Sequence, residues 1–101
     1  MPYARAAIFR FKTGADVDEV ARRVRERASG LRQQPGFVSY TAIRTGDREA
    51  IALTLWDTEQ QAEEGARSAD RWNRDNVASL LESAEAYLGE VLIYELAPGR
   101  A

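Results

Sequence analysis

The sequence predicts an α+β domain of ferredoxin-like topology, with its elements in the order strand, helix, strand, strand, helix, strand. Three observations support this fold class. Segments rich in β-branched and aromatic residues alternate with segments of helical periodicity, and Gly or Pro residues separate them. With right-handed crossovers, this order gives a four-stranded antiparallel sheet with both helices on one face. The 101 residues leave room for a single domain.

The first half of the chain is predicted to form a strand, a helix and a second strand. Tyr3 to Lys12 is dense in apolar residues toward its end, which is typical of a strand. Asp16 or Asp18 can cap the helix that follows, and Pro35-Gly36 ends it before a strand over Phe37 to Thr45. The helix has an apolar face of Val17, Val20, Val24 and Leu31 and a charged face of Arg22, Arg23, Arg25, Glu26 and Arg27.

A hairpin and a second helical region are predicted next. Gly46-Asp47 separates the preceding strand from Glu49 to Asp57, so the two strands are expected to pair in antiparallel fashion. Thr58, with Gln61 three residues later, resembles a capping box and begins the helical region.

The second helical region is predicted in two pieces, because Gly65 and the Ser-Ala-Asp stretch at 68–70 interrupt its pattern. The second piece runs from about Arg71 to Glu85, with Trp72, Asn76, Leu80 and Ala84 stacked along one side. A final strand over Glu90 to Leu96 is expected to complete the sheet.

Both alternations of the third strand are apolar. Ile51, Leu53 and Leu55 fall on one side, while Ala50, Ala52, Thr54 and Trp56 fall on the other, and the last predicted strand behaves similarly. Helices on one face leave the other face to solvent, where every second residue should be polar. In a chain this short, a second copy is the economical cover for such a face. We therefore expect a homodimer.

The composition excludes several classes of site. The chain has no Cys and no His, which removes disulfides, thiolate nucleophiles, the commonest metal ligand and the usual neutral-pH base. The formal net charge is −2, with 14 basic and 16 acidic residues mixed along the chain, so no nucleic-acid partner is indicated. No segment approaches the ~20 apolar residues that span a bilayer or the apolar core of a signal peptide. We expect a cytoplasmic protein with no membrane contact and no metal site.

Several short motifs resemble the antibiotic biosynthesis monooxygenase family. They are Pro35-Gly36-Phe37, the Leu-Trp-Asp-Thr-Glu-Gln run at 55–60, Trp72 in the second helical region, and Gly89 with Val91 near the last strand. The likeness covers nearly the whole chain, so residues 1–101 are identified as one domain of this kind. It implies a dimeric α/β barrel, in which the sheets of two protomers pack face to face. It also implies a pocket in each protomer, between its sheet and its second helical region.

The resemblance also bears on the reaction. Family members include cofactor-independent oxygenases of quinols and polyketide phenols, and haem-degrading enzymes. The haem-degrading branch has an Asn, a Trp and a His where this chain has Ala6 or Ala7, Gly65 and Asp75. The polyketide-oxidising branch has an Asn and a Trp where this chain has Gln61 and Gly65. The resemblance thus implies a protein that uses no cofactor, and it transfers no catalytic residue.

Five residues are candidates for contact with a small aromatic ligand, and each has a structural alternative. Trp72 could stack on a flat ring or pack in the core. Asn76 could orient a substrate hydroxyl or bond to a nearby backbone carbonyl. Trp56 could line the pocket or the dimer interface, or pack without a functional role. Tyr40 and Tyr94 could donate to a quinone oxygen, or bury their rings as strand residues commonly do.

Charged residues give two weaker signals. Arg5 and Arg10 lie in the first strand, where an Arg could hold an anion bidentately or form a salt bridge with Glu95. The carboxylates at one strand-to-helix junction, without His, are typical of a solvated helix start rather than a metal site; they are Asp57, Glu59, Glu63 and Glu64.

Three functions remain open. The first is a cofactor-independent monooxygenase acting on a quinol or a polyphenol. The second is a non-catalytic ligand-binding or stress-related dimeric module, and the third is a structural protein whose property is assembly. An electron-rich phenolate can reduce O₂ directly, so a protein that excludes water, orients the ring and stabilises the anion suffices for the first.

Overall fold

β1 (Tyr3–Phe11) lies inside a four-stranded sheet whose order is β2-β3-β1-β4. It pairs antiparallel with β3 (Glu49–Trp56) on one side and with β4 (Leu81–Glu90) on the other, and β3 pairs antiparallel with β2 (Phe37–Gly46). The computed structural model describes residues 2–99. Its sheet order and strand directions confirm the predicted ferredoxin-like topology.

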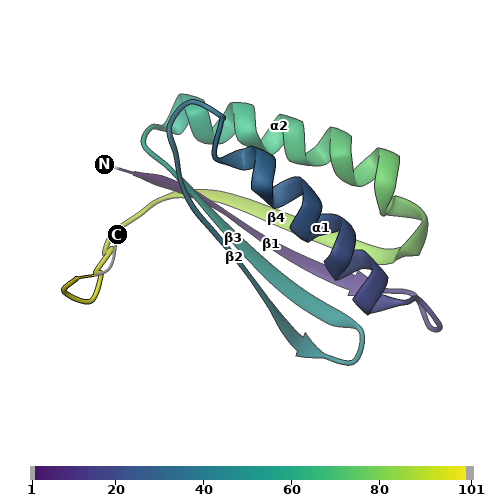
Figure 1. Ribbon diagram of the computed structural model, residues 1–101. Helices are drawn as coiled ribbons and strands as arrows, with labels where there is room; N and C mark the ends of the chain where they lie inside the picture. The colour runs from purple at the N-terminus through teal and green to yellow at the C-terminus, as the bar shows by residue number, and fades with distance from the viewer. Residues whose placement is uncertain (1, 100–101) are drawn as a thin grey trace.

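Two helices cover one face of this sheet (Figure 1). α1 (Val17–Leu31) begins after Asp16, whose carboxylate accepts a hydrogen bond from the backbone N–H three residues later at 3.1 Å. α2 (Glu59–Asn76) begins after Thr58, whose hydroxyl accepts the equivalent bond at 3.2 Å. Both caps satisfy backbone donors that the first turn leaves without a partner, so the helix starts expected from the sequence are confirmed.

The predicted break in the second helical region is wrong. α2 continues through Gly65 and through residues 68–70, and it ends at Asn76 rather than near Glu85. A 3₁₀ helix, Ala78–Leu80, then connects it to β4. Gly65 therefore does not break the helix, and its role is in packing, as described below.

The predicted last strand, Glu90 to Leu96, is also wrong, because the fourth strand is β4. Its sequence favours a helix, yet it pairs with β1 along almost the whole of that nine-residue strand, from Tyr3 opposite Glu90 to Arg10 opposite Ser83. A helix reaching Glu85 would leave much of the β1 edge without hydrogen-bond partners. Satisfying that edge outweighs a propensity of a few tenths of a kcal/mol per residue.

The two faces of the sheet differ in burial. Beneath the helices, the side chains of Ala7, Ala52 and Trp56 are buried, and Phe11, Val20 and Val77 form a core cluster. On the opposite face, the cross-strand neighbours of Ala6 are large and exposed: Leu53 is 42% exposed and Tyr87 is 60% exposed. Leu55 on the same face is only 5% exposed, so the apolar face expected from strand alternation is uncovered in part in the single chain.

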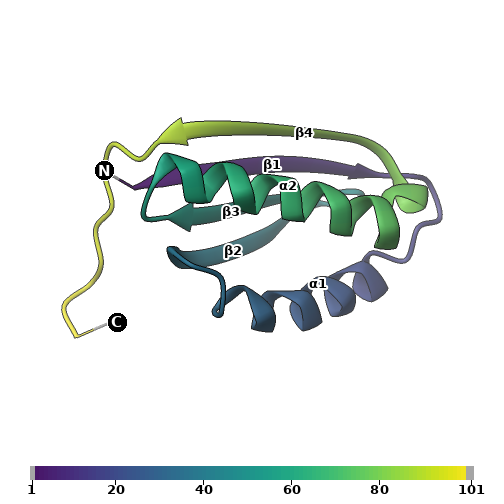
Figure 2. The same ribbon diagram turned by 90° about the horizontal axis from the view of Figure 1, so that it is seen from above.

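The residues after β4 leave the sheet and run across the ends of the other strands (Figure 2). The Val91 N–H donates to the Pro2 carbonyl oxygen at 2.8 Å, which holds the start of this segment. Beyond it, Leu92 and Ile93 are 81% and 82% exposed. Within residues 2–99, no helix combines the length and apolar character that crossing a membrane requires.

Candidate functional site

A pocket of about 410 Å³ lies between α1 and the sheet. The residues of α1 that line this pocket extend from Val17 to Ala28 and include the buried Val20, whereas Leu31, the other buried residue of the helix, lies outside it. Figure 2 shows α2 lying across β1 and β3, while α1 lies toward the β2 side of the sheet. The family resemblance implied a pocket beneath the second helical region, whereas this larger one lies beneath the first helix and only a small hollow of about 10 Å³ borders α2.

Small side chains create this space. Ala42 of β2 and both Ala50 and Ala52 of β3 line the sheet side of the pocket. Methyl groups cannot fill the gap between a helix and a sheet, and Val and Ala on the facing helix do not compensate. The remaining walls are largely apolar, with Phe9 and Phe11 among them. The volume falls within the ~300–1,000 Å³ typical of small-molecule sites.

Few polar groups border the pocket. Tyr40 lines it, and burial raises the pKa of its hydroxyl while the nearby charges of Arg27 and Arg5 act in the opposite direction. Among the charged side chains that line it, Arg44 and Asp18 form an ion pair at 3.7 Å and are largely exposed. The pocket can therefore hold an apolar ring against the sheet while offering one hydroxyl donor, that of Tyr40.

A smaller hollow, which we call the polar recess, lies beside Tyr40. Its polar lining consists of Arg5, Arg27, Thr54 and Trp56, and its volume is about 10 Å³. Arg5 is 8% exposed, and its Nη2 donates to Asp70 Oδ1 at 3.1 Å. Burial, together with the charge of Arg5, lowers the pKa of Arg27. The recess is thus bordered by one buried guanidinium group, that of Arg5, and one half-buried guanidinium group, that of Arg27.

Trp56 closes one side of the polar recess, and Gly65 makes room for it. A Cβ at position 65 would overlap the six-membered part of the indole ring, so only glycine lets α2 approach β3 this closely. Trp56 is buried, and Phe37 packs against it edge to face with ring centroids 5.7 Å apart. Its Nε1–H has no hydrogen-bond acceptor within residues 2–99.

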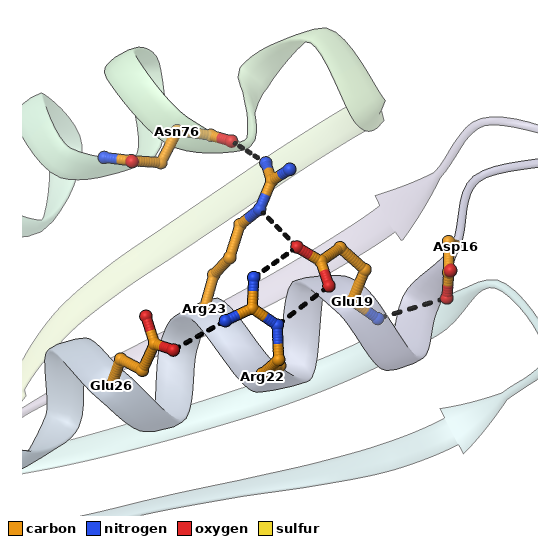
Figure 3. Close-up of polar contacts among 6 residues, drawn as sticks. All are labelled: Asp16, Glu19, Arg22, Arg23, Glu26 and Asn76. Carbon is orange, nitrogen blue, oxygen red and sulfur yellow. Dashed lines mark hydrogen bonds and ion pairs between the residues drawn. The ribbon is translucent and has the colours of Figure 1, made fainter.

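Trp72 and Asn76, two of the sequence-predicted site residues, lie near the end of α2 and line neither hollow. The Trp72 ring is half-buried, and the Arg27 guanidinium lies over it, 5.6 Å from the ring centroid. Asn76 is exposed, and its Nδ2 donates to the Trp72 carbonyl oxygen at 2.9 Å, which is the structural alternative expected for it. The backbone carbonyl oxygen of Asn76 accepts a hydrogen bond from Arg23 of α1 at 2.9 Å (Figure 3).

The other three predicted site residues fall in different places. Tyr40 and Trp56 border the large pocket and the polar recess, respectively, and are brought close together by the pairing of β2 with β3. Tyr94 is exposed in the segment after β4, away from both hollows. Ligand contact at any of the five stays a prediction.

Arg27 is the residue that the sequence pattern assigned wrongly. It was placed on the charged face of the first helix, yet it is half-buried against Trp72 and the polar recess. Its position follows from spacing, because Val20, Val24, Arg27 and Leu31 recur at i, i+4, i+7 and i+11 and so share one face. A charged residue within that apolar stripe is the feature of the sequence that indicates a partly buried arginine.

The remaining charged candidates form ion pairs with carboxylates, and of these the Arg5 side chain is buried whereas that of Arg10 is exposed. Arg5 pairs with Asp70 rather than with Glu95, and Arg10 pairs with Glu49 at 3.2 Å. Across residues 2–99, no group of three or more Asp or Glu side chains is arranged so that it could hold a metal ion.

Comparison with known proteins gives a consistent result. The model of the family described as antibiotic biosynthesis monooxygenase matches residues 2–72. No curated protein matches the sequence. Among solved structures, a protein of unknown function from Nitrosomonas europaea superimposes with a TM-score of 0.82 at 17% identity, covering 97% of this chain and 96% of that one.

Two further structures carry functional descriptions. SnoaB, a cofactor-independent oxygenase from Streptomyces nogalater, matches with a TM-score of 0.75 at 18% identity, covering 92% of this chain and 95% of its own. The heme-degrader MhuD from Mycobacterium tuberculosis, with two hemes bound in its active site, matches with a TM-score of 0.69 at 18% identity, covering 92% and 98%. At these identities the likeness establishes the shared fold.

Proposed function

This chain belongs to the antibiotic biosynthesis monooxygenase family, and from that premise we propose that it is a cofactor-independent monooxygenase of a quinol or polyphenol. Family membership supports a monooxygenase-like activity in general terms. The choice of substrate rests on the pocket beneath α1, whose apolar lining suits a flat aromatic ring. A ring held there would lie beside the Tyr40 hydroxyl.

The reaction balances with O₂ as the oxidant. A quinol that has lost a proton passes electrons to O₂, and a ring carbon forms a bond to one oxygen atom in place of its hydrogen. The second oxygen atom leaves as water, and the product is a hydroxyquinone. The pocket's contribution is to orient the ring and to remove water from around the reacting anion. Tyr40, which lines the pocket, would donate a hydrogen bond to a quinol oxygen.

Haem is a poorer candidate for this pocket. The chain has no His, and at position 65, where the haem-degrading branch has a Trp, the Trp56 ring fills the space beside a glycine. These two differences from the haem-degrading branch support a smaller aromatic substrate.

The proposed working unit is a homodimer in which the uncovered sheet faces of two copies pack together as a barrel. Leu53 and Tyr87 are exposed on that face, and the segment after β4 presents Leu92 and Ile93 beyond the protomer's own sheet. A second copy is the partner that carries a matching surface by symmetry. Sedimentation velocity should therefore give a dimer that Leu53→Glu dissociates and that Gln60→Glu, an exposed change on α2, leaves intact. A wild-type monomer would contradict the proposed assembly.

Oxygen uptake with a panel of quinols tests the activity. Ala42→Phe should abolish uptake, because the ring fills the pocket from its β2 side, and a strand tolerates an aromatic residue well. Ala86→Phe is the matched control, since Ala86 is an exposed strand alanine that does not line the pocket. Uptake that is absent from wild type, or equal in the two variants, would contradict the monooxygenase proposal. Quinol binding without uptake would favour the ligand-binding module.

A further inference from the structure

We propose that the polar recess binds a single anionic oxygen of the aromatic ligand, so that the pocket selects planar aromatics in their phenolate or enolate form. This inference rests on the proposed function for the placement of the ring. It adds a binding site for the charged substituent, formed by Arg5, Arg27, Thr54 and Trp56.

The two hollows are adjacent along the sheet. Thr54 pairs with Arg5 on one side and with Tyr40 on the other, which forms one cross-strand row. The next row consists of Ala7, Ala52 and Ala42, and its last two residues line the large pocket. A ring lying over the alanine row would therefore direct a substituent toward the arginine row.

The charges of the recess are unbalanced. Arg5 has one carboxylate partner, Asp70, whose side chain is 70% exposed. Arg27 has no carboxylate within ion-pair distance in residues 2–99, and it packs on the face of Trp72 instead. A buried and a half-buried guanidinium group together attract an anion more strongly than two fully exposed ones would.

The other polar groups of the recess are also donors. The buried Trp56 Nε1–H can only donate, and it has no acceptor within the described residues. Thr54, which is buried, adds a hydroxyl. A volume of about 10 Å³ accommodates roughly one atom of water size, which fits an oxygen substituent rather than a whole sulfate or carboxylate.

A pair of fluorescent probes separates the recess from the pocket. 7-Hydroxycoumarin and coumarin share one ring system, and only the first can present a phenolate. For wild type we expect the apparent pKa of the bound 7-hydroxycoumarin, read from its phenolate absorption, to fall by about one unit. This corresponds to about tenfold tighter binding of the phenolate than of the neutral phenol.

Variants of the recess test which residues cause the pKa shift of the bound 7-hydroxycoumarin. Arg27→Gln should remove most of that pKa shift and leave coumarin affinity within about twofold, while Arg27→Lys should retain part of it. Asp70→Asn should strengthen phenolate binding, because it removes the carboxylate that competes for Arg5. Arg71→Gln, which removes an exposed guanidinium of α2, serves as the control and should change neither probe.

The outcomes distinguish this inference from the proposed function. If coumarin binds but the phenolate gains no advantage, or if Asp70→Asn weakens phenolate binding, the recess does not bind the anionic oxygen and the pocket proposal survives. If neither probe binds, both proposals are wrong. An equal loss of both probes in Arg27→Gln would assign Arg27 a structural role and would also overturn the inference.

Discussion

The two helices cover the same sheet face in opposite ways. α2 lies tight against β1 and β3, with Ala62 fully buried and the Trp56 ring pressed on Gly65. α1 buries only Val20 and Leu31 and leaves a pocket of about 410 Å³ between itself and the sheet. The difference follows from the sizes of the facing side chains. A large residue from the sheet meets a glycine under α2, whereas alanines of the sheet meet Val and Ala under α1.

The largest change in stability should come from adding a methyl group where α2 packs against Trp56. Gly65→Ala places a methyl group within the Trp56 ring, so the two elements must move apart. We expect the free energy of unfolding to fall by about 2 kcal/mol in urea titrations. Gly30→Ala is the control, because its added methyl group meets nothing within 4 Å, and it should be neutral or raise stability by up to about 1 kcal/mol. Equal effects would contradict the close approach.

The anchoring of α1 should give the next largest effect. Val20→Ala removes two buried methyl groups from the cluster with Phe11 and Val77, and should lower the free energy of unfolding by about 1.5 kcal/mol. Val24→Ala removes the same atoms from a side chain that is only half-buried, and should lower it by less than half as much. Chemical denaturation of the two variants side by side checks this. If they were equal, α1 would be packed evenly along its length.

A smaller effect is expected where α1 is joined to α2. Arg23 donates to the Asn76 carbonyl oxygen and to Glu19, and this link crosses between the helices (Figure 3). Arg23→Met keeps the side chain's length and removes these bonds, so stability should fall by about 0.5–1 kcal/mol. Amide exchange should quicken in α1 more than in α2. Unchanged exchange in α1 would mean that the link does not position this helix.

The smallest expected effect is a loss of stability at low pH that depends on Glu19. Hydrogen bonds from Arg22 and Arg23 hold the pKa of Glu19 at about 2, below its ordinary value of 4.5. A carboxylate with a depressed pKa in the folded protein contributes stability that is complete above its unfolded pKa and is lost as the pH falls toward the folded one. The difference in melting temperature between wild type and Glu19→Gln should therefore be present at pH 7 and shrink between about pH 4.5 and pH 2. A difference independent of pH would contradict it.

The sequence predicted most of the fold for reasons that are local. Asp16 and Thr58 cap helices through bonds to residues three positions away, and Gly46-Asp47 turns a hairpin between adjacent strands. β4 could not be found in this way, because residues 81–90 favour a helix and become a strand only through pairing with distant β1. The same long-range pairing leaves Val91 onward, the more β-prone stretch, outside the sheet.

The site was harder to predict than the fold, because it depends on space rather than on residue type. Tyr40 and Trp56 were identified from their chemistry, and they do border the two hollows. The alanines that make the pocket carry no chemical signal, and their effect appears only when they face α1 across the sheet. The charge of Arg27 predicts exposure, whereas its spacing from Val20 and Leu31 places it on the buried face of α1.

The most direct test of the account is a crystal structure of the protein with 7-hydroxycoumarin, at a pH where the phenolate forms. The ring should lie beneath α1 over Ala42 and Ala52, with its phenolate oxygen within hydrogen-bond distance of Arg5 or Arg27. A ring bound elsewhere, such as on the outer surface of α2 beside Trp72, or a phenolate oxygen turned away from both arginines toward solvent, would contradict it.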